Sequence, residues 1–216
     1  LSDRWQPVVS VNSLPHASEI SKPTSGPRAA STANPGAGVR NDAVNLCKDC
    51  PNVNEMLWYA EKGDMHVDEN ILWTAMGHLR KGGFWLKTKA KMASDNSTTV
   101  ANIKDFAPDG TDWRNKIYSP SMERRITVTT TTPPSASDLN NYFFLPSLGF
   151  FWDVSLTTNG FSVGENLLAG YWSSSSIEGS SASAITIVPK TPSGYEMRFH
   201  PRNDRSLNGY VALKFE

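Results

Sequence analysis

Cys47 and Cys50 are the only cysteines of the 216-residue chain, and they form a Cys-x-x-Cys pair ahead of a predicted helix. Such a pair can be a redox centre within a βαβ pattern, part of a zinc site with two further ligands, or a short-loop disulfide. The sequence lacks a repeated βαβ pattern, and its four histidines are scattered singly. We therefore favour a disulfide or two thiols at the helix entrance, and an exported protein would favour the disulfide.

Residues 160–164, Gly-Phe-Ser-Val-Gly, match the Gly-x-Ser-x-Gly elbow, in which a sharp strand-to-helix turn exposes a nucleophilic serine. No clean strand precedes Ser162, and its partners would be His200 and Asp204, in the reverse of the α/β-hydrolase order. We interpret the segment as a glycine-rich loop between strands. We expect no catalytic residues, and a serine hydrolase or other enzyme ranks last of three functions.

Asp64, His66, Asp68 and Glu69 lie close together in the sequence and could supply oxygen and nitrogen ligands to a metal ion. Their spacing is not that of an EF-hand. Acidic residues are also favoured at a helix start, where they cap free N–H groups and meet the positive end of the dipole. We therefore expect no metal and no other cofactor, with calcium as the alternative.

Two amphipathic helices are predicted early in the chain. The first begins at Asn52, which forms a capping box with Glu55, and Gly63 closes it in the left-handed conformation. The second begins at Asp68 and stops at Gly82. The buried stripe of the second helix would be Leu72, Ala75, Met76 and Leu79.

Beyond Gly83 the apolar period changes from 3.6 to 2, which predicts strands. The predicted strands cover residues 84–86, 126–130, 184–188, 195–200 and 211–216. The polar segments 94–121 and 132–141 are predicted as loops. Helices followed by antiparallel strands predict an α+β fold, with two early helices packed on a mostly antiparallel, twisted sheet.

Residues 1–45 differ from the rest of the chain, because prolines interrupt serine, alanine and glycine without a helical period. They predict an irregular arm or linker with a short strand over 6–11, ahead of one domain at 46–216. The 21 basic and 21 acidic residues cancel, so the overall charge predicts no nucleic-acid partner. No apolar run reaches the ~18–20 residues of a transmembrane helix, and any secretion signal was removed or lies upstream.

Four segments combine proline, glycine and aromatic residues in a distinctive order. They are residues 50–55 (Cys-Pro-Asn-Val-Asn-Glu), 82–85 (Gly-Gly-Phe-Trp), 144–151 (Phe-Leu-Pro-Ser-Leu-Gly-Phe-Phe) and 171–175 (Tyr-Trp-Ser-Ser-Ser). Together they resemble C-type-lectin-like domains of Bacteroidetes surface proteins, related to the Fibrobacter-type major paralogous domain and often attached to fimbrillin-like modules. The resemblance covers residues 46–216 and implies a C-type-lectin-like fold.

The resemblance implies binding at a cell surface, since family members are similar to adhesins or pilus-associated proteins. Calcium-dependent lectins of this fold carry a Trp-Asn-Asp strand, whereas serines follow Trp172 here, which does not favour conventional calcium-lectin activity. Formylglycine-generating enzymes of the fold need a late cysteine pair. No cysteine follows Cys50, which excludes that enzyme.

We expect the ligand site on the long loop over 152–169, because relatives bind ligands with loops on a rigid scaffold. Its candidate residues are Trp152, Asp153, Asn159 and Asn166, which could offer a stacking ring and polar groups to a sugar or peptide. The alternative for Trp152 is burial in the core, together with the aromatic residues at 150, 151, 171 and 172.

The expected function is non-catalytic adhesion or recognition, with a glycan or protein of a host or microbial surface as ligand. The expected location is the cell surface, outer-membrane-associated as a secreted lipoprotein, or extracellular. The alternative is a structural or tip subunit of a fimbria-like assembly, with fimbrial subunits as partners and the N-terminal arm contributing a strand.

Overall fold

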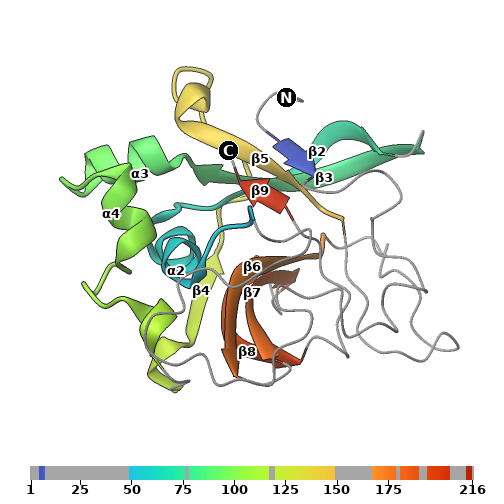
Figure 1. Cartoon of the computed structure of the whole chain (residues 1–216). Helices are drawn as coiled ribbons and strands as arrows, with labels where there is room; N and C mark the ends of the chain where they lie inside the picture. The colour runs from blue at the N-terminus through green and yellow to red at the C-terminus, as the bar shows by residue number, and fades with distance from the viewer. Residues whose placement is uncertain are drawn as a thin grey trace, which may run out of the picture.

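The described part of the chain forms three antiparallel sheets and several short helices (Figure 1). The computed structural model describes residues 5–7, 49–75, 78–116, 120–148, 167–178, 181–189, 194–204 and 213–215. The helices are α2 (Val53–Lys62), α3 (Lys89–Asp95) and α4 (Val100–Asp105), with 3-10 turns η3 (Trp113–Asn115), η4 (Pro120–Met122) and η5 (Leu139–Asn141). The strands are β1 (Trp5–Pro7), β2 (His66–Ala75), β3 (His78–Lys87), β4 (Arg124–Val128), β5 (Tyr142–Pro146), β6 (Ala169–Glu178), β7 (Ser181–Pro189), β8 (Tyr195–Asp204) and β9 (Leu213–Phe215).

The strand orders are β2-β3-β5, β4-β8-β7-β6 and β1-β9, and every pairing is antiparallel. The α+β class predicted from the sequence is confirmed. Strands β7 and β8 contain the period-2 segments over 184–188 and 195–200, and β4 contains the first three residues of the segment over 126–130, ending at Val128. In β8 the side chains of Tyr195, Met197 and Phe199 are buried while the residues between them are half-buried, as the alternation predicts.

The first predicted helix is confirmed as α2, including its capping box. The Asn52 side chain accepts a hydrogen bond from the Glu55 N–H at 3.0 Å, and the Glu55 carboxylate accepts one from the Asn52 N–H at 2.8 Å. The predicted left-handed Gly63 is wrong, because Gly63 has φ −70° and Asp64 has φ +46° instead. Gly63 is required for space: an added Cβ would lie 2.3 Å from the Tyr59 carbonyl oxygen.

The second predicted helix, over 68–81, is wrong, because these residues form the β2–β3 hairpin. Asp68 caps an irregular turn of the strand, where its carboxylate accepts hydrogen bonds from the N–H groups of Asn70 and Ile71. Strand β3 pairs with β5, and Trp73 packs against the aromatic cluster of that sheet. These long-range contacts override a local spacing of apolar residues that suits a helix.

Helix α4 and the last two residues of α3 lie within the segment 94–121, which the sequence predicts as a loop, and the rest of α3 just precedes that segment. Each begins at a threonine N-cap, Thr88 for α3 and Thr99 for α4, whose side chain accepts a hydrogen bond from the backbone of the first turn. With seven and six residues, the helices have too few turns to display an apolar period.

Helix α2 lies between the two larger sheets and contacts strands from both (Figure 1). Its side chains Met56, Leu57 and Tyr59 are fully buried in the main core. The Tyr59 ring meets the Phe143 ring of β5 edge-on at 5.6 Å between centroids. A residue pair of the predicted aromatic core, Tyr171 and Trp172, is also fully buried, whereas residues 150–152 lie outside the described residues.

The two ends of the chain meet in the smallest sheet. Trp5–Pro7 of the N-terminal arm pairs with Leu213–Phe215 in antiparallel register (Figure 1). The sequence predicts an arm strand over 6–11, and the described strand begins one residue earlier.

Candidate functional site

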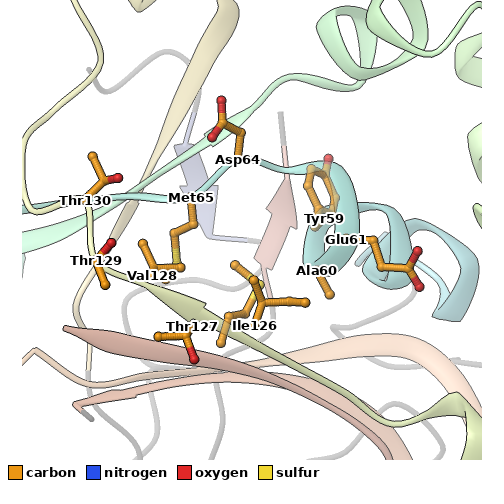
Figure 2. A pocket seen from close by; sticks show the side chains of 11 residues that line it. Tyr59, Ala60, Glu61, Asp64, Met65, Ile126, Thr127, Val128, Thr129 and Thr130 are labelled. Atoms are coloured by element: carbon orange, nitrogen blue, oxygen red, sulfur yellow. The ribbon is translucent and has the colours of Figure 1, made fainter. Parts of the chain in front are cut away.

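A cavity of about 210 Å³ lies between the C-terminal half of α2, the turn that follows it, and strand β4 (Figure 2). Apolar side chains gather at its centre and polar side chains lie around them. The apolar residues are Ala60, Met65, Ile126, Val128 and Met197, together with the ring of Tyr59; the polar residues are Glu61, Asp64, Thr127, Thr129 and Thr130.

Ion pairs hold the acidic residues at the rim of this cavity. Glu61 pairs with Arg124 of β4 at 2.5 Å, which ties the last turn of α2 to the strand. Asp64 accepts a hydrogen bond from the Tyr142 hydroxyl at 2.8 Å and pairs with Lys87 at 3.3 Å. The cavity wall is therefore set by contacts among α2, β3, β4 and β5.

Asp64, in the turn after α2, has a lowered pKa and a left-handed backbone conformation. Burial raises the pKa of Asp64, but hydrogen bonds from Tyr142 and Lys87 outweigh burial and hold this pKa below its ordinary 3.8. Burial lowers the pKa of Lys87, but its contacts with Asp95 and Asp64 outweigh burial and raise this pKa above 10.5. The left-handed backbone of Asp64 is uncommon outside glycine, and aspartate tolerates it better than most residues.

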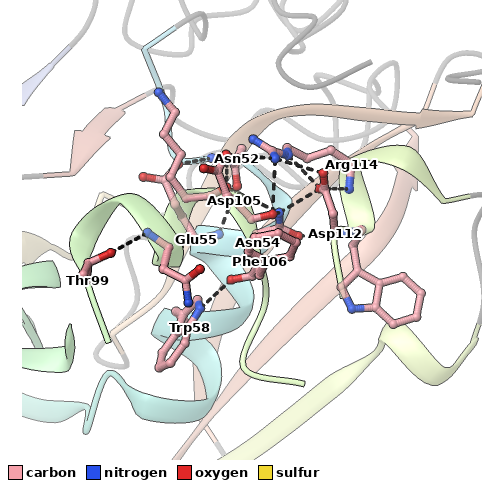
Figure 3. A network of polar contacts seen from close by, with 12 residues as sticks. Asn52, Asn54, Glu55, Trp58, Thr99, Asp105, Phe106, Asp112 and Arg114 are labelled. Carbon is pink, nitrogen blue, oxygen red and sulfur yellow. Dashed lines mark hydrogen bonds and ion pairs between the residues drawn. The ribbon is translucent and has the colours of Figure 1, made fainter. Parts of the chain in front are cut away.

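A polar network fixes the other end of α2 (Figure 3). The Asn54 amide donates to the Asp105 carbonyl and to Asp112, both at 3.0 Å, and its oxygen accepts the Trp113 N–H. Arg114 is only 4% exposed and donates to both carboxylate oxygens of Asp112, at 2.7 and 2.9 Å. Burial raises the pKa of Asp112, but bonds from Arg114 and Asn54 outweigh burial and lower it. These satisfied buried groups lock α2 against α4 and η3.

The same helix start is also joined to β6 and α3. The Ser174 N–H donates to the Pro51 carbonyl at 2.8 Å, and the Ser175 hydroxyl accepts from the Val53 N–H at 3.1 Å. Lys89 of α3 pairs with Glu55 at 3.0 Å. Two of the four motif segments singled out in the sequence, at 50–55 and 171–175, thus meet in space.

The predicted ligand residues Trp152, Asp153, Asn159 and Asn166 lie outside the described residues, as does Ser162. His200 is described, and its Nε2 lies 2.9 Å from the Thr186 hydroxyl of β7. Burial lowers the pKa of His200, and the charges of Arg198 and Arg125 add to this effect.

Cys50 is disulfide-bonded, and Cys47, the chain's only other cysteine, lies outside the described residues.

The side chains of the acidic segment after α2 each contact a different group. Asp64 contacts Tyr142 and Lys87, His66 lies 3.0 Å from the Thr132 carbonyl, and Glu69 accepts a hydrogen bond from the Tyr195 hydroxyl at 2.8 Å. Within the described ranges, no three histidine, cysteine or acidic residues are placed to share a metal ion.

The sequence gives no signal for the cavity itself. Its walls come from residues 59–65 and 126–130, which are far apart in the chain, and from Met197. Thr127 alternates with the apolar residues of β4 as in any half-buried strand, and Thr129 and Thr130 directly follow the strand. Only the packing of α2 against the sheet turns them into the rim of a cavity.

Comparison with protein-family models, with curated proteins and with solved structures gave no match. Among the described residues, none of the helices has the length and apolarity that crossing a membrane requires.

Replacing Asn52 with alanine should lower the free energy of unfolding by about 2–4 kcal/mol, because it removes the cap and leaves buried partners unsatisfied. The Asn52 side chain also donates to the Lys104 carbonyl at 2.9 Å, and the residue is fully buried. Urea unfolding followed by tryptophan fluorescence measures the loss. The matched control is Thr99→Ala, an exposed cap of α4, which should lose about 1 kcal/mol; equal losses would contradict a special role for Asn52.

Asp64→Ala should be less stable than Asp64→Asn by about 1 kcal/mol, because asparagine tolerates the left-handed backbone and alanine does not. Since the folded pKa of Asp64 is lowered, its stabilisation is present above 3.8 and is lost as pH falls through the folded value. As pH falls below about 4, the free energy of unfolding should therefore depend less on pH in Asp64→Asn than in the parent chain. Asp49→Asn, an exposed carboxylate, is the control; the same flattening there would refute the assignment to Asp64.

Proposed function

We propose that this chain is a non-catalytic recognition module of a cell surface, which binds a glycan or protein ligand. The cavity between α2 and β4 is its binding site in the described part of the chain. The observation that carries the proposal is the combination of an apolar centre with a rim of threonine hydroxyls and carboxylates.

The chemistry of the cavity fits one sugar ring best. Apolar side chains such as Met65 and Ile126 can pack against the C–H face of a pyranose, while Thr127 and Thr129 exchange hydrogen bonds with its hydroxyls. A volume of about 210 Å³ is smaller than the roughly 300–1,000 Å³ of sites for drug-sized ligands. A terminal or single exposed residue of a glycan is therefore the expected ligand.

The rigidity of the site supports recognition without chemistry. The Glu61–Arg124 and Asp64–Lys87 pairs engage the rim carboxylates with neighbouring side chains. A wall that is ordered before binding loses less conformational entropy when the ligand arrives. The disulfide at Cys50 supports a surface or extracellular location, because disulfides persist in oxidising compartments.

A glycan array followed by titration calorimetry with the full chain tests this function. Thr127→Val with Thr129→Val should raise the dissociation constant of the best glycan by about 5- to 30-fold, since each hydroxyl contributes about 1 kcal/mol to binding. Thr131→Val, an exposed threonine in the same segment outside the cavity lining, should change it less than twofold.

The result also locates the site. If Trp152→Ala or Asn166→Ala abolishes binding and the threonine variants do not, the recognition function stands and its site is the loop over 152–169. If the array and a protein array give no ligand, the recognition function is wrong.

A second candidate function is a structural subunit of a fimbria-like assembly. It is favoured by the β1–β9 pairing, in which a strand from the N-terminal arm completes a sheet with the C-terminal strand. The same ladder formed between two copies would join subunits by strand addition. The short length of both strands makes exchange easy, because few hydrogen bonds are broken.

Cysteines introduced at the paired positions 6 and 214 distinguish β1–β9 pairing within one chain from the same pairing between two copies. Gln6 and Lys214 are register partners, so Gln6→Cys with Lys214→Cys should cross-link under oxidation. Strand exchange between copies predicts a ladder of covalent multimers on a non-reducing gel. Cross-linking within single chains only would contradict the assembly by this route.

A further inference from the structure

The distal half of the β2–β3 hairpin is a two-stranded ribbon that projects beyond its sheet (Figure 1). Among the described residues, β5 pairs with β3 over Gly83–Lys87, whereas residues 72–75 pair with 78–81 alone. A two-stranded ribbon is marginally stable in water unless something braces it.

Trp73 braces the ribbon. Its indole N–H donates to the Gly82 carbonyl at 2.7 Å, and its ring packs with Ile71 against the cluster of Trp85, Tyr142 and Phe144. The ribbon is thus held at its base by aromatic packing rather than by its own leucines.

The opposite face of the ribbon presents two leucines to solvent. Directly paired residues share a face, so the pairs Leu72–Lys81 and Thr74–Leu79 lie together, opposite Trp73. Leu72 is 58% exposed and Leu79 is 68% exposed, the highest values for large apolar residues of the described part. Exposing neighbouring leucines on a projecting ribbon is unfavourable in water and indicates a contact surface.

Two cations lie next to these leucines in the ribbon: Lys81 shares their face, whereas Arg80, the register partner of Trp73, lies on the opposite face. Arg80 and Lys81 are both exposed, and neither forms an ion pair within the described residues. The acidic residues at the ribbon's base are engaged: Asp68 accepts two backbone N–H groups and Glu69 accepts the Tyr195 hydroxyl. Because Asp68 lies opposite Gly83 at the base, the positive charges of Arg80 and Lys81 are concentrated in the distal half of the ribbon, beside the exposed leucines.

We propose that the ribbon formed by residues 72–75 and 78–81 docks on an anionic lipid bilayer surface. Leu72 and Leu79 enter the interface between headgroups and acyl chains, and Lys81 on the same face contacts a lipid phosphate. The long side chain of Arg80 reaches the headgroups around the edge of the narrow ribbon. Two apolar side chains with two cations give reversible attachment, which depends on anionic lipid and on low ionic strength. Charge complementarity selects the bilayer, because apolar contact alone would not need two exposed cations that form no ion pair within the described residues.

Vesicle co-sedimentation of the full chain tests the docking. Binding to vesicles of phosphatidylglycerol and phosphatidylcholine is expected, with far less binding to phosphatidylcholine alone. Arg80→Gln with Lys81→Gln should weaken the partition coefficient roughly 20- to 30-fold, from about 1 kcal/mol per cation near the surface. Leu72→Ser with Leu79→Ser should weaken it on both kinds of vesicle.

The matched control variants remove exposed cations or an exposed leucine from positions outside the ribbon. Lys62→Gln with Lys104→Gln deletes two exposed cations, and Leu139→Ser deletes an exposed leucine. Each should change partitioning less than twofold. All variants should keep the thermal midpoint of the parent, since the changed side chains are exposed.

Three results would overturn the proposal. The first is no partitioning onto anionic vesicles. The second is partitioning that the Arg80 and Lys81 substitutions leave unchanged. The third is self-association lost in Leu72→Ser with Leu79→Ser without vesicle binding, which would assign the surface to a second copy of the chain.

Discussion

The buried N-terminus of α2 is the constraint on which the rest of the structure depends. Backbone N–H groups at a helix start need partners, and inside a protein they cannot obtain them from water. Asn52 and Glu55 cap the first turn, and the Ser175 hydroxyl accepts the Val53 N–H. Ser175 belongs to β6, and the capping residues themselves bind other elements: Asn52 donates to the Lys104 carbonyl of α4, and Glu55 pairs with Lys89 of α3. Satisfying this helix end therefore also fixes β6, α3 and α4 around it.

The far end of the same helix shapes the candidate site. Once α2 is fixed, its last turn and the Asp64 turn lie against β4, and the Glu61–Arg124 and Asp64–Lys87 pairs hold that spacing. The cavity is a consequence of how a helix meets a sheet edge. A recognition function suits such a site, since its apolar centre and polar rim are both supplied by elements that are rigidly held.

Charge and apolar surface are distributed unevenly over a chain whose net charge is zero. Around α2 and Asp64 the ionic side chains described above lie in pairs that stabilise the fold, whereas Arg80 and Lys81 are left without such pairs in the described part. Two leucines lie exposed beside them instead of in the core. The molecule thus combines a braced body with a projecting ribbon whose side chains contribute little to folding, which is the arrangement expected of a surface that contacts something else.

The sequence by itself determined the features that depend on near neighbours. Asn52 and Glu55 are three residues apart, so a capping box is legible locally, and the alternation in β4, β7 and β8 follows from the two faces of a strand. Residues 68–81 were predicted as a helix because Leu72 and Leu79 have helical spacing. They form a hairpin because β3 pairs with β5 and Trp73 packs against the aromatic cluster of that sheet. The walls of the cavity come from segments about 60 residues apart in the chain. The exposure of the two leucines likewise depends on which distant strands pair with the hairpin. Only the tertiary structure could decide both, because burial depends on which distant elements pack together.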